Sequence, residues 1–565
     1  MHGAFKAWQQ ALKYDTASPS TLLRAASSCA DLLISQRSYE GAKPILLAAV
    51  RLLPMLSPRI LQRKDQQFGI SQFANITSRA VSLCLADGDD PYKTLQLCEL
   101  GRGILANTQL ELRSDISLLA AHHPDLAQRF QDLRNLIDPP SKIWESSTID
   151  TLSIPNSTST LQFAAAINSQ RRAHLKEFDD LVQFIHSLPG YEDFLQGPSK
   201  AELHSLVEYG TIVLLNVSDI RSDAFLITTE EIRCLRLPLL TPESLEKFTE
   251  RFLSAVNRRS MRGWQDARLE VNAVLEWLWD VAVDPILNEL GFTQMPSKDD
   301  PWERIWWIGN GLLSLLPLHA AGYHESTPLN TAIDRVISSY APTIKSLSYA
   351  RERAARSDRQ TPQEKAVLIS MPTTPDKKPL PYVEKEVRDV ESLLSMAFVD
   401  TRVMENPRKS AIPSALPGYT IVHFACHGNT AHDPSGSHFL LEDLPLTVSD
   451  IVSLNIEWGR FAYLSACHTS GMRKLRLLDE SINLSSAIQL SGYPSVIGSL
   501  WSVTEEHSAK VARDVYRWIL REKGGLDAQK SAEGLHKAVR GLRDSTRFMT
   551  KQDPLIWAPF IHVGI

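Results

Sequence analysis

The sequence predicts an α-helical repeat region followed by an α/β domain with a doubly wound sheet at the C-terminal end. Small and apolar residues recur at helical spacing within the first 140 residues. Strand and helix patterns alternate from residue 367 onward, which is typical of a parallel sheet covered by helices. At 565 residues the chain is long for one domain, and at about 150 residues per domain it should hold three or four units.

Residues 1–140 are expected to form helical hairpins. The repeated positions, 38 residues apart, are Ala4, Trp8 and Ala11 and then Ala42, Leu46 and Ala49. This spacing resembles that of the second helix of a tetratricopeptide repeat. A plain helical bundle would pack through the same small residues and is the alternative. Because solenoids present extended surfaces, the expected task of this region is to bind a regulatory protein or a substrate.

Two segments connect the repeats to the final domain. Residues 141–205 begin with a stretch rich in serine and threonine and are interpreted as a linker with helices. Residues 206–300 contain a β-meander signature at 211–217, 223–228 and 232–237, followed by long helices. We expect this second segment to be a small added sheet with helices that precedes the final domain.

Residues 301–565 follow a βα rhythm. The sequence from Thr447 to Asp450 has the pattern of a capping box at the start of a helix. Gly492 is the expected stop of a later helix. The expected elements are a strand at 367–370, a helix at 382–397, a strand at 398–403, a short helix at 409–416, strands at 419–424 and 461–464, and a helix at 479–490.

Two of these strands end in reactive side chains. The runs at 419–424 and 461–464 are β-prone and nearly uncharged, as central strands are, and they lead to His427 and Cys467. Functional groups of such sheets gather beyond the carboxyl ends of the strands. The 40 residues between His427 and Cys467 leave room for the crossover that parallel neighbours require. We therefore expect the two side chains to meet.

The order of these motifs resembles that of a CHAT domain. The resemblance rests on His427-Gly428, on Ser465-Ala-Cys467, on the segment 492–501 and on the terminal segment 554–560, and it spans roughly residues 300–565. It implies a caspase-like cysteine protease fold related to separase, often attached to tetratricopeptide repeats. By that resemblance His427 is the catalytic histidine and Cys467 is the nucleophile.

Elementary chemistry agrees with this assignment. A free thiol has a pKa of about 8.5, so an imidazole neighbour is needed to produce thiolate near neutral pH. His427 would take that proton and later protonate the leaving amine. Gly428 allows a close approach of a substrate carbonyl, and the backbone N–H groups of Gly428 and Cys467 are the expected oxyanion hole. No cofactor is required.

Several residues have competing interpretations. Cys426 adjoins His427 but should point to the opposite face of the strand, so we interpret it as packing. His423 and His319 are expected to be core histidines. A zinc site built from His423, Cys426, His427, Cys467 and His468 is disfavoured, because strand alternation scatters these side chains over two faces. We expect no bound metal.

Four acidic residues are candidates for a pocket that receives a basic P1 side chain of a substrate. They are Asp479, Glu480, Glu505 and Glu506, and they follow the two C-terminal motif strands. The alternative is structural, because acidic residues are favoured in the first turn of a helix. Three tryptophans near the motifs, Trp306, Trp307 and Trp501, are assigned to the core.

Composition limits the partners and the compartment. The 60 basic and 65 acidic residues give a formal charge of −5, which indicates no nucleic-acid partner. The apolar runs are shorter than the roughly 20 residues of a membrane helix, and the first residues lack the apolar core of a signal peptide. Six cysteines in so long a chain do not resemble a disulfide framework. We therefore expect a cytoplasmic protein without membrane contact.

Two hypotheses of function follow. The first is a cysteine endopeptidase that cleaves a specific protein target and is controlled through its helical repeats. The second is an interaction scaffold whose CHAT fold is catalytically silent. The intact pair of His427 and Cys467 favours the enzyme, because a silent member is expected to lose one of the two. The sequence does not reveal the target, the P1 specificity or the trigger.

Overall fold

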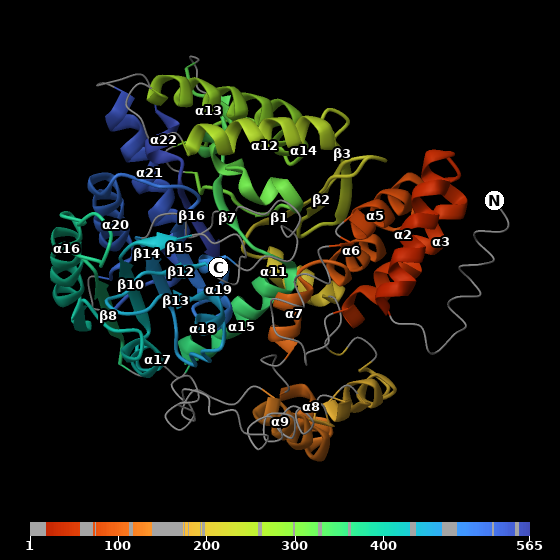
Figure 1. Ribbon diagram of the computed structural model, residues 1–565, viewed down its shortest axis with the longest axis horizontal. Helices are drawn as coiled ribbons and strands as arrows, with labels where there is room; N and C mark the ends of the chain where they lie inside the picture. The colour runs from red at the N-terminus through yellow and green to blue at the C-terminus, as the bar shows by residue number, and fades with distance from the viewer. Residues whose placement is uncertain are drawn as a thin grey trace, which may run out of the picture.

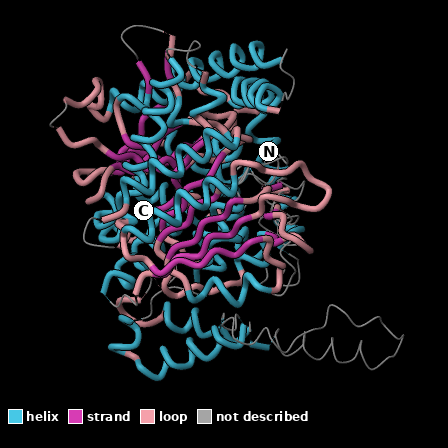
Figure 2. Tube along the Cα trace, turned by 90° about the vertical axis from the view of Figure 1, so that its left-hand side faces the viewer, coloured by secondary structure: helices cyan, strands magenta, loops and turns pink. Residues whose placement is uncertain are grey.

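The computed structural model shows helices around one large twisted sheet (Figures 1 and 2). Of the N-terminal helices, α2 (Pro19–Ser35), α3 (Tyr39–Leu52) and α5 (Asn75–Ala86) lie at one end of the sheet, and helix α16 (Val383–Met396) lies at the other end (Figure 1). The structure describes residues 19–56, 72–73, 75–111, 117–137, 173–174, 176–178, 180–191, 194, 198–257, 263–297, 300–325, 330–359, 363–429, 437–465, 483–521, 525–547 and 553–565.

The described part of the first 140 residues is helical, as the sequence predicts. Its apolar spacing places Ala42, Leu46 and Ala49 in the core, whereas the matching positions 4, 8 and 11 lie outside the described residues. The tetratricopeptide assignment therefore stays a prediction. The helices are α2 (Pro19–Ser35), α3 (Tyr39–Leu52), α5 (Asn75–Ala86), α6 (Pro91–Leu100), α7 (Ile104–Glu111), α8 (Ser117–His122) and α9 (Pro124–Ile137).

Within the described residues, the sheet has eleven strands in the order β3-β2-β1-β4-β7-β16-β15-β14-β10-β8-β9. Most neighbours are parallel, and the exceptions are β1 with β2, β2 with β3 and β15 with β16. The strands are β1 (Thr211–Asn216), β2 (Asp223–Ile227), β3 (Ile232–Arg236), β4 (Arg304–Ile308), β7 (Ile337–Tyr340), β8 (Lys365–Ser370), β9 (Asp400–Glu405), β10 (Ile421–Ala425), β14 (Phe461–Leu464), β15 (Ser495–Ser499) and β16 (Phe560–Gly564).

The predicted β-meander forms, but it is not a small sheet of its own. Strand β1 pairs in parallel with β4, so that β1, β2 and β3 extend the central sheet. The sequence predicted a small sheet that extends the final domain at its N-terminal side, and these strands do extend it, but as part of the central sheet. Every residue of β1 and β2 is buried, and such strands need cover on both faces.

The last strand of the chain lies in the middle of the sheet. Strand β16 is antiparallel to β15 over five residue pairs and meets β7 on its other side, where Val563 pairs with Tyr340. It therefore joins two halves. One half is β3-β2-β1-β4-β7, and the other half is β15-β14-β10-β8-β9.

Helices cover both faces of the sheet. On one face, α16 packs on β8, β9 and β10, next to α20 (Glu505–Ile519) and α21 (Ser531–Arg547). On the other face, α15 (Ile344–Arg359) and α19 (Leu484–Ser491) pack against β16. Further helices are α11 (Lys200–Val207), α12 (Pro242–Val256), α13 (Trp264–Leu278), α14 (Asp284–Glu289), α17 (Ala411–Ala415), α18 (Val448–Val452) and α22 (Pro554–Trp557).

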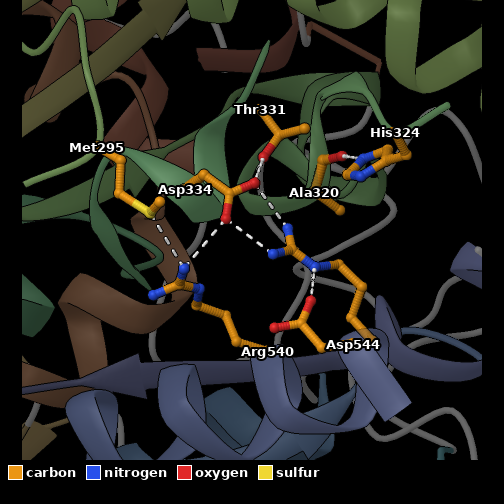
Figure 3. Close-up of polar contacts among 8 residues, drawn as sticks. Met295, Ala320, His324, Thr331, Asp334, Arg540 and Asp544 are labelled. Atoms are coloured by element: carbon orange, nitrogen blue, oxygen red, sulfur yellow. Dashed lines mark hydrogen bonds and ion pairs between the residues drawn. The ribbon is translucent and has the colours of Figure 1, made fainter. Parts of the chain in front are cut away.

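A buried ion pair fastens α21 to the sheet half that contains β7. Both oxygens of Asp334 accept hydrogen bonds from the guanidinium of Arg543, at 2.7 and 2.8 Å, and Arg543 is only 1% exposed (Figure 3). Thr331 donates to the same carboxylate at 2.6 Å, and Arg540 contacts it at 3.3 Å. These bonds satisfy charges that would otherwise be costly to bury.

The N-terminal helices dock on the sheet through buried polar contacts. Glu99 of α6 is 3% exposed, and its Oε2 accepts from the backbone N–H groups of Ile344 and Lys345 at 2.9 and 3.3 Å. Those groups belong to the first turn of α15, where N–H donors have no partner within the helix. Arg102 donates to the side chain of Asn216 in β1 at 2.7 Å. The helical region is thus fixed to both α15 and β1.

Candidate functional site

Strand β10 carries the predicted catalytic histidine. It lies between β14 and β8, parallel to both, and its residues are buried. The N–H of Met371 donates to the carbonyl of Ala425 at 2.9 Å, which extends the pairing with β8 to the last residue of the strand. His427 follows two residues later and is half-buried at the carboxyl end of the strand.

The imidazole of His427 is held by a backbone carbonyl. Its Nε2 lies 2.9 Å from the carbonyl oxygen of Lys378, to which it donates. A neutral ring with its proton on Nε2 leaves Nδ1 as an acceptor. Lys378 belongs to the connection between β8 and α16. Sequence reasoning did not identify this contact, because every residue type offers the same carbonyl.

The next residue, Gly428, opens a small three-stranded sheet of β11 (Gly428–Asn429), β12 (His438–Phe439) and β13 (Leu446–Thr447). The N–H of Leu440 donates to the carbonyl of His427 at 2.9 Å, so these two residues form a hydrogen-bonded pair. Along two antiparallel strands, pairs that exchange backbone hydrogen bonds alternate with pairs that do not. The neighbouring pair, Gly428 with Phe439, is therefore one without backbone hydrogen bonds. The N–H of Gly428 points away from β12.

Strand β14 runs beside β10 in a fixed register. Ile421 lies opposite Phe461, and Phe424 lies opposite Leu464. The N–H of Ser465 donates to the carbonyl of Phe424 at 2.8 Å, which continues the pairing by one residue. Residues 466–482 lie outside the described part of the chain, and they include Cys467, Asp479 and Glu480.

The first turn of α20 touches both sides of the candidate site. The hydroxyl of Ser508 lies 2.8 Å from that of Ser465, at the end of β14. Glu505 accepts from the N–H of Tyr382 at 3.2 Å, on the connection that contains Lys378. Glu506 is exposed. Neither Ser508 nor Tyr382 was identified from the sequence, since neither carries a motif.

A buried polar cluster lies below the site, between β10, β14 and the helices α16 and α20. Nε2 of His423 is 3.1 Å from Glu386, its Nδ1 is 3.4 Å from the hydroxyl of Tyr516, and its ring stacks on Tyr463. Burial raises the pKa values of both tyrosines well above their ordinary value, so both hydroxyls stay neutral. His423 is a core histidine, as the sequence predicts.

The other residues assigned to packing are buried as well. Cys426 is 2% exposed, and Trp306, Trp307 and Trp501 are fully enclosed. His319 bonds to Tyr340 and to the carbonyl of Ala558, and burial lowers its pKa to about 4. No cluster with the composition of a metal site occurs among the described residues. Cys467 and His468 are not among these, so the expected lack of zinc stays a prediction.

The chain belongs to the CHAT domain family. The family model matches residues 272–565, which is more than half of the chain. The resemblance inferred from the sequence motifs is thereby confirmed, and so is the fold class, an α/β sheet with helices on both faces and a helical region before it. No curated protein sequence matches the chain significantly.

Solved structures offer distant likenesses. The chain is similar to separase in two crystal structures of the Saccharomyces cerevisiae separase–securin complex, with 12% identity and a TM-score of 0.44, over 99% of this chain and 48% of that one. It is also similar to the Arg-specific cysteine proteinase gingipain R, with 11% identity and a TM-score of 0.36, over 50% of this chain and 68% of that one. The chain thus spans about half the length of separase.

Proposed function

We propose that this protein is a cysteine endopeptidase of the caspase and separase class, with Cys467 as nucleophile and His427 as general base. The register of β10 and β14 is the observation that carries the proposal. Paired residues along these strands differ by 40 in number, which is the separation of His427 and Cys467. Paired residues of parallel strands project to the same face of the sheet. Continuation of the register by three residues would bring the two side chains together.

The orientation of the histidine supports the same role. With Nε2 bound to the carbonyl of Lys378, Nδ1 would accept the proton of the Cys467 thiol. The sulfur would then attack the peptide carbonyl carbon, and the C–N bond would break as His427 returns the proton to the leaving amine. Water would hydrolyse the resulting thioester and regenerate the thiol.

An oxyanion hole is proposed at the N–H groups of Gly428 and Cys467. The N–H of Gly428 is not part of the ladder with β12, so within the described part of the chain it has no ladder partner and would be available to a substrate oxygen. Donors of this kind contribute a few kcal/mol to the stabilisation of a transition state. A substitution that adds a Cβ at position 428 would restrict the approach of the substrate carbonyl.

A basic P1 preference is the accompanying proposal. Glu505 and Glu506 start α20, whose first turn contacts Ser465, two residues before Cys467. Asp479 and Glu480 are the further candidates. A fluorogenic panel that varies only P1 tests this, and we expect Arg or Lys to be turned over best. Glu505→Gln keeps an acceptor for the N–H of Tyr382 but removes the charge, so a lost preference would identify the charge itself as the determinant.

The targets are proposed to be proteins. The N-terminal helices are proposed to bind a regulator, since they are fixed to the same sheet as the site. Among the described residues, no helix is both long and apolar enough to cross a membrane. A cytoplasmic location stays a prediction.

The test compares three single variants. An acylating probe that reacts with activated thiols should label the wild type at residue 467. Peptide cleavage by Cys467→Ala and by His427→Ala should each fall by at least about a thousandfold. Cys426→Ala is the matched control, because it removes a neighbouring buried thiol and should keep full activity. A wild type that labels no more than Cys467→Ala would favour the silent scaffold.

A further inference from the structure

Strand β9 forms one edge of the central sheet as far as the described residues define it. It pairs in parallel with β8 over six residues, from Lys365 with Asp400 to Ser370 with Glu405. No described strand pairs with its other side. The opposite edge of the sheet differs, because α6 packs against β3 there. An open edge presents N–H and C=O groups ready to pair with another chain.

The direction of these groups follows from one hydrogen bond. The N–H of Asn406 donates to the carbonyl of Ser370 in β8 at 2.9 Å. Backbone groups of successive residues in a strand point to opposite sides, so Asp400, Arg402 and Met404 face β8 in the same way. The N–H and C=O groups of Thr401, Val403 and Glu405 then face outward.

An exposed apolar pair adjoins this edge. Met396 is 74% exposed and Phe398 is 81% exposed, at the end of α16 just before β9. Phe398 has a φ of +57°, in the left-handed position that closes the helix and that usually holds glycine. A side chain with a Cβ is strained in this conformation, whereas glycine is not. Phe398 therefore combines a strained backbone conformation with an aromatic ring that is exposed to solvent.

We propose that a second copy of this chain pairs antiparallel along β9, with Thr401 opposite the partner's Thr401. In this arrangement Val399 lies opposite the partner's Val403, and Asp400 lies opposite the partner's Arg402. Phe398 lies opposite the partner's Met404. The two sheets would become one continuous sheet across a twofold axis.

Charge selects this register among the neighbouring ones. A twofold axis perpendicular to the sheet allows only registers in which a residue lies opposite its own copy. A twofold axis at residue 400 would place two aspartates opposite each other, and an axis at residue 402 would place two arginines opposite each other. Both arrangements are unfavourable. Centring on Thr401 gives two pairs of opposite charge. Asp400 is free to take part, because its contact with Lys365 is 3.8 Å long and exposed.

The outward backbone groups fit the same register. Thr401 and Val403 point their N–H and C=O groups outward, whereas the N–H of Val399 donates to the carbonyl of Leu394 at 3.0 Å. Thr401 with the partner's Thr401 is then a hydrogen-bonded pair, and the N–H of Val403 donates to the carbonyl of the partner's Val399. Asp400 and Arg402 form the closer pairs without ladder bonds, where side chains approach best.

Sedimentation velocity of the full chain over a range of concentrations tests the proposal. We expect the wild type to dimerise reversibly. In a dimer of Arg402→Asp, Asp400 of each copy would lie opposite an aspartate at position 402 of the other copy. In a dimer of Asp400→Arg, Arg402 of each copy would lie opposite an arginine at position 400 of the other copy. Each variant alone should dimerise at least about tenfold more weakly. An equal mixture of the two should dimerise again, because every contact is then of opposite charge. The matched control is Arg388→Asp, on the exposed face of α16, which should leave the dimer unchanged.

Phe398→Gly provides a second, independent measurement. Glycine relieves the left-handed strain, so the melting temperature of the isolated monomer should rise while dimerisation weakens. A wild type that stays monomeric, a dimer that both charge variants retain, or a mixture that behaves like its components would each overturn the proposal. A monomer that instead binds an unrelated extended peptide along β9 would do the same, since it would assign the edge to another partner.

Discussion

The contact between Glu99 and α15 should make docking of the N-terminal helices dependent on pH. Burial raises the pKa of Glu99 from 4.5 to about 7, opposed by its backbone partners and by Arg102. Below about pH 4.5 the carboxyl is protonated in the folded and the unfolded chain alike, and its contribution to stability is fully present. Between pH 4.5 and 7 only the unfolded chain loses the proton, so this stability falls as the pH rises, and above 7 it no longer changes.

The size of the effect follows from the shift. A rise of two to three pKa units corresponds to about 3 kcal/mol, spread over the window from pH 4.5 to 7. Glu99→Gln keeps an oxygen for the N–H groups of Ile344 and Lys345 but cannot ionise. The assay is the melting temperature of the wild type and of Glu99→Gln between pH 5 and 8.5. We expect the melting temperature of Glu99→Gln to rise relative to that of the wild type as the pH increases to 7. A difference that stays constant across this range would refute the reasoning.

Two further predictions concern the fold. Arg543→Met should destabilise the domain by about 3 kcal/mol, because the buried carboxylate of Asp334 keeps only the bond from Thr331 and the longer contact with Arg540. The double variant with Asp334→Asn should recover part of this loss in urea unfolding. Gly492→Ala should lower the melting temperature sharply, since φ is +127° and a Cβ would overlap the carbonyl of Ile456. Gly541 lies on α21 with no atom within 4 Å of an added Cβ, so Gly541→Ala should raise the melting temperature slightly. Equal effects of the two substitutions would contradict the steric argument.

The sequence predicted what depends on local pattern. The strand at 461–464 is β14 as observed, and the helix at 382–397 is α16 within a residue at each end. The capping box is confirmed too, since Thr447 accepts from the N–H of Asp450 and the carboxylate of Asp450 accepts in return. These features depend on residues a few positions apart, where periodicity and capping chemistry decide the structure.

What the sequence could not predict depends on distant partners. The meander around residues 211–237 was recognised, but its pairing with β4 joins positions about ninety residues apart. The carbonyl that orients His427 comes from Lys378, and the cap of α15 comes from Glu99, 245 residues before it. Neither contact leaves a pattern in the neighbouring sequence.

The central place of β16 has a consequence for synthesis on the ribosome. All strands on either side of it are made earlier, and β7 and β15 are separated in the sheet by β16 alone. While residues 560–564 are still in the exit tunnel, β7 and β15 would each lack the neighbour that they pair with in the folded sheet. Such unpaired edges are prone to misassembly. The backbone hydrogen bonding that joins the half with His427 to the half with the N-terminal helices would be completed only after residues 560–564 emerge, so a chain that stops short of them would lack this strand connection.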